Sequence, residues 1–122
     1  MPDHEPIDLA GKLASFDEHW TPKRIARVND TDVKLAKLSG EFVWHRHEAE
    51  DELFIVLEGR LLMQFRDREV WLGPGQAILV PRGVEHRPVA PEETHVMLIE
   101  PAGTLNTGNL RNERTVDEVE SI

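Results

Sequence analysis

The sequence contains no cysteine and no tyrosine, and each absence removes a kind of chemistry. Without cysteine there is no disulfide, no thiolate metal ligand and no cysteine nucleophile. Any bound metal must therefore take imidazole and carboxylate ligands. Without tyrosine, one common general acid and base is missing, and no histidine or lysine apart from the candidate metal ligands is clearly placed to replace it.

Positive charge is also scarce. The chain has 14 Lys and Arg against 23 Asp and Glu, which gives a formal net charge of −9. Nucleic acid and anionic membranes would both repel such a chain. The sequence also lacks a helix-turn-helix pattern or a basic segment, so we expect neither a nucleic-acid partner nor a membrane partner.

Long apolar runs are missing as well. No run approaches the length that spans a membrane, and the acidic start MPDHEPIDLA lacks the apolar centre of a signal peptide. The sequence therefore predicts a cytoplasmic protein. Its 122 residues, 39% hydrophobic and 30% charged, fit one folded domain with a single core.

Residues 1–22 indicate a short helical segment. Asp8 is a suitable N-cap, and the pair Thr21-Pro22 ends the pattern. Between them, apolar residues recur at helical spacing on one face: Leu9, Leu13, Phe16 and Trp20. We expect this segment to pack on the rest of the domain.

From residue 23 the pattern changes to short apolar runs separated by turn residues, which is typical of an all-β sandwich or barrel. The predicted strands lie near 24–28, 33–38, 41–47, 53–57, 60–65, 69–72, 76–80, 86–89 and 94–99. The β domain thus covers 23–101. The remaining residues 102–122 are rich in Thr, Asn and Gly and then acidic, which predicts a loosely held tail.

The stretch WHRHEAEDELFIVLEG, residues 44–59, carries the first chemical signal. If 41–47 is a strand, His45 and His47 lie about 7 Å apart on one face, with Phe42 and Trp44 on the other. Two imidazoles on one face suit a divalent metal, although the pair alone also fits two exposed surface histidines. Further along, VPRGVEH places His86 after a Pro/Gly turn, where it could also serve only as a turn cap.

Four acids compete to complete such a site: Glu48, Glu50, Asp51 and Glu52. Glu52 begins the next apolar run and shares a face with Phe54 and Val56, which favours an inward position. The other three fit a solvated loop.

These two stretches resemble the two motifs of the cupin family. HRHEAEDELFIVLEG resembles the first motif, with matching residues His45, His47, Glu52 and Gly59. GQAILVPRGVEH resembles the second motif, with matching residues Gly75, Pro81, Gly83 and His86. Gly40 departs from the pattern by lying five residues before His45 rather than six, and Ala90 departs by standing where Asn is usual.

The chain resembles the small single-domain bacterial cupins that are often labelled as similar to mannose-6-phosphate isomerase. The resemblance implies an all-β fold, the cupin double-stranded β-helix or jelly-roll barrel, with the short helix added in front. It also implies one divalent transition metal, Zn, Ni, Mn, Fe or Co, bound by His45, His47, Glu52 and His86. Glu52 is thereby selected among the four acids.

The remaining candidates have structural interpretations. His95 is expected to be a strand histidine, and His4 and His19 surface residues. Trp44, Trp71 and Met63 are expected in the core. Arg82 and Arg87 flank His86 and are expected to be solvated, with anchoring of a substrate carboxylate or phosphate as the less favoured alternative.

A site with three imidazoles and one carboxylate keeps open positions for water, O₂ or substrate. We therefore expect a metal-dependent enzyme, an isomerase, lyase or dioxygenase, acting on a small polar metabolite chelated to the metal. A non-catalytic binding or sensing module and a structural metal barrel are the alternatives. Because both faces of the run LFIVL are apolar, we also expect a homodimer that covers the outer face.

Overall fold

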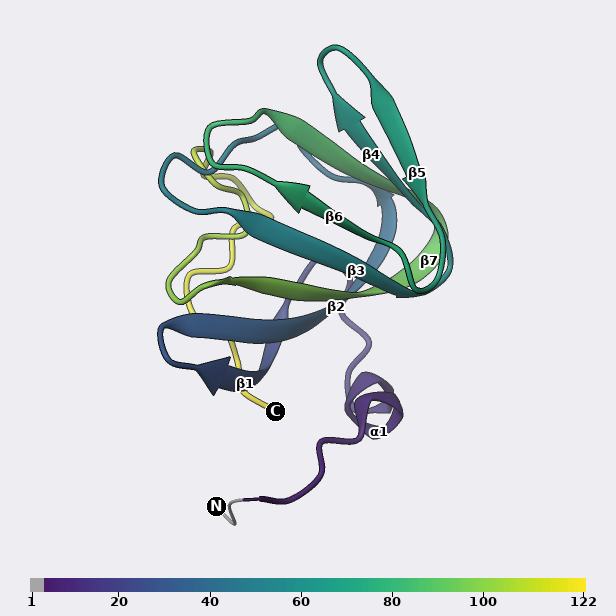
Figure 1. The fold of residues 1–122 in the computed structure, drawn as a ribbon, viewed down its shortest axis with the longest axis vertical. Helices are drawn as coiled ribbons and strands as arrows, with labels where there is room; N and C mark the ends of the chain where they lie inside the picture. The colour runs from purple at the N-terminus through teal and green to yellow at the C-terminus, as the bar shows by residue number, and fades with distance from the viewer. Residues whose placement is uncertain (1–3) are drawn as a thin grey trace.

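The computed structural model describes residues 4–122, which form one short helix and seven strands (Figure 1). The elements are α1 (Leu9–Ala14), β1 (Lys23–Val28), β2 (Thr31–Glu41), β3 (Glu52–Glu58), β4 (Leu61–Phe65), β5 (Glu69–Leu72), β6 (Ala77–Val80) and β7 (His86–Pro101). The prediction of an all-β fold with a short N-terminal helix is confirmed.

All strand pairs are antiparallel, and β7 joins two parts of the sheet. Five strands follow the order β1-β2-β7-β3-β6, while β4 pairs with both β5 and β7. The first residues of β7 pair with β4, as in Met63 opposite Pro88. Its later residues lie between β2 and β3, as in Leu98 between Lys34 and Phe54. One bent strand therefore connects both layers.

The core lies between these layers and follows the two-residue period of the strands. On β3 the buried residues are Glu52, Phe54 and Val56, as predicted, while the intervening residues are partly exposed. The buried apolar cluster comprises Ala36, Leu38, Phe54, Val56, Leu61, Met63, Leu72, Val80, Ala90, Val96 and Leu98. Burying each of the larger side chains contributes about 1.5–3 kcal/mol.

The predicted strands 33–38 and 41–47 are wrong in their boundaries. β2 runs unbroken to Glu41, and the following residues leave the regular ladder. Gly40 has a φ of +83°, and the register with β7 shifts between Leu38 and Gly40. Between these two pairs β2 advances by two residues and β7 by four, from Thr94 to Ala90, so the extra residues of this irregularity lie on β7. Beyond this shift, Gly40 pairs with Ala90, so the two departures from the motif lie opposite each other.

Phe42 keeps the alternation of β2 and points to the same side as Ala36 and Leu38, with which it lines a cavity. The expectation that Phe42 shares an outer face with Trp44 is wrong, because Phe42 is buried and lines an internal cavity together with His45. Trp44 is half-buried outside that cavity, beneath the guanidinium of Arg66 at 3.8 Å.

The predicted strands 86–89 and 94–99 are parts of the single strand β7. Residues 91–93 between them are exposed but stay extended, because β7 bends there from one layer to the other. Two apolar runs interrupted by exposed residues are thus one continuous strand.

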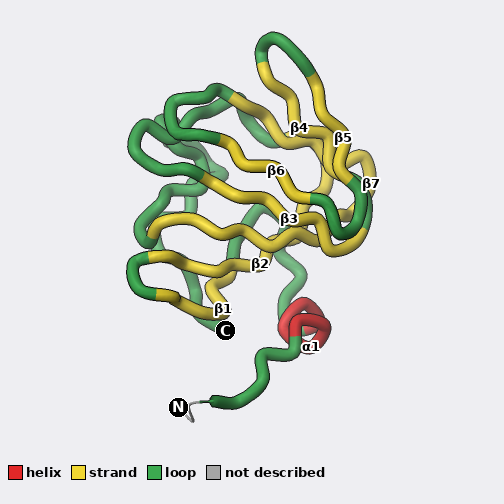
Figure 2. The backbone as a smooth tube through the Cα atoms, viewed as in Figure 1, coloured by secondary structure: helices red, strands yellow, loops and turns green. Residues whose placement is uncertain are grey.

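The helix is shorter than predicted. It ends at Ala14 rather than near Trp20, contains no buried residue, and receives no side-chain hydrogen bond from Asp8. Figure 2 shows it apart from the strands. Six residues are too few for a stable isolated helix. The segment is held instead by Phe16, which is buried, and by the Trp20 indole, which donates a hydrogen bond to the Ser39 carbonyl at 2.9 Å. No helix within residues 4–122 has the length and apolarity to cross a membrane.

The segment after Pro101 differs from the predicted loose tail. It contains little regular structure, yet Thr107 is fully buried, and the Asn109 amide donates to the Arg46 carbonyl at 2.9 Å. Near its end, the Arg24 amide donates to the Glu120 carbonyl at 2.8 Å. The yellow segment in Figure 1 accordingly runs along the sheet and ends near β1. The polar residues that indicated a loose tail hold it in place. The division of the chain at residues 22 and 101 stays a prediction.

Candidate metal centre

Four side chains from distant parts of the chain meet inside the barrel. His45 and His47 follow β2, Glu52 begins β3 and His86 begins β7. All four are buried, and one possible ligand atom from each lies within 4.8 Å of the others. The four residues that the sequence predicts as metal ligands therefore lie side by side in the fold.

Backbone contacts fix the segments that carry these side chains. His45 and His86 form an isolated bridge, in which the His45 amide donates to the His86 carbonyl at 3.0 Å and the reverse bond measures 2.9 Å. The Gly83 amide donates to the His47 carbonyl at 2.7 Å. Gly83 has a φ of +80°, which glycine adopts without strain. The turn before His86 is therefore attached directly to the strand-like segment before Glu52.

In two of the histidines, a neighbouring backbone carbonyl determines which ring nitrogen carries the proton. The Nδ1 atoms of His45 and His86 each lie 2.9 Å from a backbone carbonyl oxygen, those of Val43 and Val84. Because a carbonyl oxygen only accepts, each Nδ1 must carry the proton and donate it. The Nε2 atoms then keep a free lone pair, the arrangement in which a second hydrogen bond orients a metal-ligating histidine.

Several of the candidate ligand atoms lack hydrogen-bond partners within the described chain. His47 Nε2, His86 Nε2 and Glu52 Oε1 are buried without one. Glu52 Oε1 lies 3.3 Å from His47 Nε2 and 3.5 Å from His86 Nε2. Ligand atoms on an ion with bonds of about 2.1 Å are separated by about 3.0–3.4 Å. Because a buried unpaired polar atom costs free energy, this cluster fits a bound metal ion.

The protonation states favour the same role. Burial, together with the neighbouring His86, lowers the pKa of His45 to about 4, so its imidazole is neutral at neutral pH. Burial acts to raise the pKa of Glu52, but the neighbouring imidazoles of His47 and His86 outweigh it, and the pKa is lowered. A neutral imidazole and an ionised carboxylate are the forms that bind metals.

A cavity of about 40 Å³ adjoins the cluster, with His45 and Glu52 in its wall. By this measure a single water needs about 10–15 Å³, so the space suits a few waters or a small ligand. Most of its lining is apolar: Trp20, Pro22, Ala36, Leu38, Phe42, Phe54, Pro88, Val96 and Leu98. Glu100 and Asn106 add polar groups. Apolar walls with a few directed polar groups are typical of small-molecule sites.

An ion pair that the sequence pattern did not predict lies beside this cavity. Lys34 Nζ lies 3.5 Å from Glu100 Oε1, and both side chains are buried. Glu100 lines the cavity, and its Oε2 has no hydrogen-bond partner among the described residues. Burial and then the charge of Glu52 raise the pKa of Glu100 well above its usual value, against the effect of Lys34. Lys34 shares the inward face with Ala36 and Leu38, so a charged residue within that apolar alternation was the available signal.

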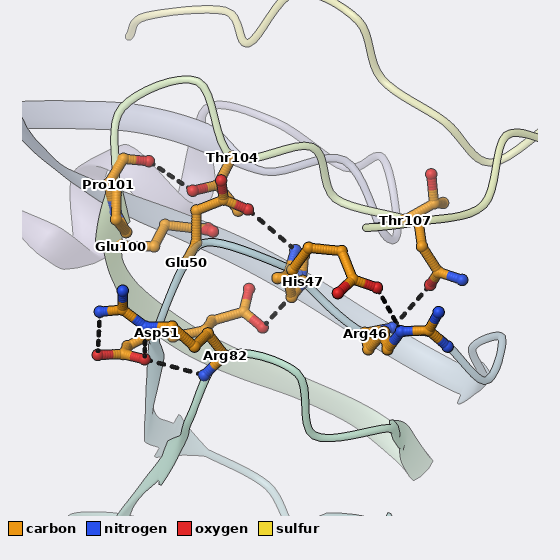
Figure 3. A network of polar contacts seen from close by, with 12 residues as sticks. Arg46, His47, Glu50, Asp51, Arg82, Glu100, Pro101, Thr104 and Thr107 are labelled. Atoms are coloured by element: carbon orange, nitrogen blue, oxygen red, sulfur yellow. Dashed lines mark hydrogen bonds and ion pairs between the residues drawn. The ribbon is translucent and has the colours of Figure 1, made fainter.

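The three rejected acids lie outside the cluster. Figure 3 shows Asp51 paired with Arg82, at 3.2 Å, and Glu50 facing the outer side of His47, with Oε1 4.0 Å from Nδ1. Glu48 is exposed and pairs with Arg46.

Neither arginine beside His86 lines the cavity. Arg82 is engaged by Asp51, while Arg87 donates to Gln64 at 2.7 Å and pairs with Glu41 at 3.3 Å. Because both arginines have these partners and lie outside the cavity, neither position supports the alternative that an arginine here binds a substrate carboxylate or phosphate.

The other residues that the sequence analysis singled out lie outside the cluster. Met63 is buried in the core as predicted, but Trp71 is half exposed, so its predicted core position is wrong. His95 lies in β7 as predicted, outside the cluster, with Nε2 3.1 Å from Glu93 Oε2. His4 and His19 are exposed, as predicted.

Comparison with known proteins agrees with this architecture. Residues 31–100 match the family described as Cupin domain. A cupin-2 domain-containing protein from Shewanella frigidimarina superposes with a TM-score of 0.77 and 48% identity, covering 78% of this chain and 93% of that protein. Protein NMB1881 from Neisseria meningitidis gives 0.73 and 32%, covering 80% of this chain and all of that one (100%).

A curated relative is also similar. The uncharacterized protein YdbB from Bacillus subtilis (strain 168) is 50% identical over 64 residues. These residues are 52% of this chain and span 57% of the length of YdbB. The two motifs, the antiparallel barrel and these matches show that the chain belongs to the cupin family.

Proposed function

We propose that the protein binds one divalent transition metal ion through His45, His47, Glu52 and His86. We further propose that it acts as a metal-dependent enzyme, an isomerase, lyase or dioxygenase, on a small polar metabolite. The observation that carries this proposal is the set of buried ligand atoms that have no hydrogen-bond partner among the described residues, in a cluster beside a small cavity.

The residues around the centre have separate roles in this proposal. When bound, a divalent ion would polarise a carbonyl group or activate water, and four protein ligands would leave up to about two positions open. The carbonyls of Val43 and Val84 hold two imidazoles in position. The apolar walls limit the access of water, and Glu100 offers an acceptor or donor to a ligand hydroxyl. The nitrogen and oxygen ligands suit Zn, Ni, Mn, Fe or Co.

A metal-dependent binding or sensing module is the second candidate. It is favoured by the few acid–base groups in the cavity wall, where Glu100 is the one such group outside the proposed ligands within residues 4–122. Because Lys34 already engages Glu100, its freedom to transfer protons is reduced.

The first experiment is metal analysis of the protein purified without a metal-chelating tag. We expect about one transition metal ion per chain, lost in His47→Ala and kept in the control His95→Ala. Absence of stoichiometric metal, together with an unchanged melting temperature in His47→Ala, would show that the ligand assignment is wrong.

The second experiment separates the possible functions. The metal-bound protein is incubated with sugar phosphates, 2-oxo acids and 1,3-diketones, and turnover and binding are measured. Turnover supports the enzyme, whereas binding without turnover supports the sensing module. If chelation lowers the melting temperature and none of these compounds binds, the metal has a structural role. The cytoplasmic location stays a prediction, to be checked by cell fractionation.

A further inference from the structure

Three buried carboxylates lie side by side in an inward row across the sheet. Asp32 of β2 is paired in register with Glu100 of β7. Glu52 begins β3 one residue before Leu53, which pairs with Ile99 of β7. Glu52 therefore lies opposite Glu100 on these antiparallel strands, with Cβ atoms about 5 Å apart. Because neighbouring carboxylates repel each other, each member of the row needs a positive partner of its own.

The partners of Asp32 and Glu100 differ. Each oxygen of Asp32 lies beside an arginine, Oδ2 at 3.1 Å from Arg24 Nε and Oδ1 at 2.8 Å from Arg27 Nε. Glu100 pairs with Lys34 through Oε1, at 3.5 Å, and its Oε2 has no hydrogen-bond partner among the described residues. The side chain of Glu100 is 3% exposed and lines the cavity beside the metal centre, whereas Asp32 lies outside that cavity. The carboxyl group of Glu100 is therefore available to a ligand in the cavity.

The other polar side chains of the cavity wall are already engaged. The Trp20 indole donates to a backbone carbonyl at 2.9 Å. Asn106 donates to one backbone carbonyl and accepts from one backbone amide of the C-terminal segment, both at 2.8 Å. Apart from the proposed metal ligands, Glu100 is then the one wall residue within 4–122 that keeps a polar atom without a partner. A ligand in the cavity thus meets two polar positions, the metal centre and Glu100.

The charges around Glu100 restrict which ligand group it can receive. The carboxylate of Glu52 beside it would repel a second carboxylate or a phosphate group. The ammonium group of Lys34, which is also buried, would repel a positively charged amine. A hydroxyl group carries no charge, and it both donates and accepts hydrogen bonds, so it pairs with a carboxyl group in either protonation state. The position therefore suits a hydroxyl group.

We propose that Glu100 binds the hydroxyl group of a short ligand whose carbonyl or carboxylate oxygen binds the metal ion. The inference rests on the proposed function, because it names the ligand class of that same site, short hydroxy acids and hydroxy ketones. Lys34 holds Glu100 through Oε1 and leaves Oε2 for the hydroxyl. A cavity of about 40 Å³ holds a few water-sized groups, which limits the ligand to a short chain.

The test compares two ligands that differ by one hydroxyl group. Glycolate and acetate are titrated calorimetrically into the full-length protein loaded with the metal found in the purified sample. The double variant Lys34→Met/Glu100→Leu replaces both charges by apolar side chains of similar size, a change that proteins with buried ion pairs often tolerate. Asp32→Asn is the matched control, because it removes a buried carboxylate of the same row that lies outside the cavity.

The measured quantity is the preference for glycolate over acetate within each protein. We expect wild type and Asp32→Asn to bind glycolate more tightly than acetate by about tenfold or more, since a hydrogen bond to a buried charged group is lost with acetate. The double variant should bind the two ligands with affinities within about threefold of each other, because no polar group remains at this position. Metal content should be the same in all three proteins.

Each other outcome has a definite meaning. A preference for glycolate that persists in the double variant would overturn the inference, because the metal ion would then bind the hydroxyl. Equal affinities in wild type, or loss of the preference in Asp32→Asn, would also overturn it. Tighter binding of glycine than of glycolate would replace the hydroxyl by an ammonium group.

Failure of the inference can be separated from failure of the proposed function. If the purified protein holds no metal, the proposed function fails, while a glycolate preference lost only in the double variant would still support the contact with Glu100. If the double variant does not fold, Glu100→Gln takes its place. Its neutral amide makes a weaker hydrogen bond than a carboxylate, so an unchanged preference there would overturn the inference.

Discussion

Glu52 is the one carboxylate in the cluster, and it was selected from four neighbouring acids. The strand period placed it on the inward face with Phe54, and the structure buries both. The choice could be predicted because it depends only on residues that are close in the sequence. These residues give both the alternation of side chains along one strand and the spacing of the first motif. The position of Glu100 was not predictable in this way, because its neighbours come from β2 and β3.

Replacing Glu52 by Gln should weaken metal binding at least tenfold. The change removes the negative charge and one ligand oxygen while keeping the side-chain shape. The measurement is competition for the metal by a chromophoric chelator. Glu48→Gln is the control, because Glu48 is exposed and lies outside the cluster. Equal affinities in the two variants would contradict the role of Glu52.

The metal-free protein should lose stability in mild acid because of His45. Its folded pKa of about 4 lies below the ordinary value of 6.5, so between these values the unfolded chain binds a proton that the folded chain does not. The free energy of unfolding therefore falls as pH decreases, by about 1.4 kcal/mol per unit, or about 2 kcal/mol between pH 7 and pH 5. The lowered pKa of Glu52 acts in the same direction below pH 4.5.

Urea unfolding of chelator-treated protein at pH 7 and pH 5 measures this difference. The His45→Asn variant serves as the control, because asparagine does not titrate and should show a smaller difference. Equal stability of the wild type at both pH values would contradict the proposed effect of burial.

Among the structural elements, the C-terminal segment differs most from its sequence-based expectation. Its composition indicated a loose tail, because Thr, Asn and Gly are common in disordered chains. The same residues supply the hydrogen bonds that attach it to Arg46 and to one another. Composition does not distinguish polar groups that face water from polar groups that face a backbone, so this element could not be predicted.

Gly108→Ala should destabilise the protein by more than Gly103→Ala. Both glycines have positive φ, which costs an alanine about 1–2 kcal/mol. At Gly103 an added Cβ meets nothing within 4 Å, whereas at Gly108 it would overlap the Arg46 carbonyl oxygen at 2.2 Å. Thermal unfolding of both variants measures the difference. Equal melting temperatures would mean that the segment is not held closely against Arg46.

For several strands, the local sequence pattern was enough to predict the boundaries. The expectations for 53–57, 69–72 and 76–80 agree with β3, β5 and β6 to within one residue at each end, because each is a short apolar run closed by turn residues. The pattern did not reveal the register shift opposite Gly40, because its extra residues lie on β7, near the exposed residues 91–93 that remain within the strand. The alternation changes between Phe42 and His45, which both line the cavity although they are three residues apart, because residues 42–44 lie outside the regular strand.

At the scale of the whole molecule, the outer face of the sheet is apolar. Register places Val33, Ile99, Leu53 and Leu79 in one row across β2, β7, β3 and β6. Leu79 is 56% exposed. We propose that a second copy of the chain covers this row, because exposed rows of large apolar side chains commonly mark interfaces.

Leu79→Glu should shift the protein from dimer to monomer, since the charge would have to be buried in the interface. Sedimentation or light scattering at several concentrations measures the mass. Val28→Glu is the control, because Val28 is also exposed, at 60%, but lies at the β1 turn outside the row. A monomeric wild type would contradict the proposal.

The sixteen residues of β7 begin at a proposed ligand, His86, and end just beyond Glu100 at the cavity. Along this length they are bonded to β2, β3 and β4. Neither layer can separate without breaking hydrogen bonds to this shared strand. The barrel should therefore melt in a single cooperative transition, with circular dichroism and tryptophan fluorescence giving the same midpoint. Two separate midpoints would mean that one layer can unfold while the other keeps β7.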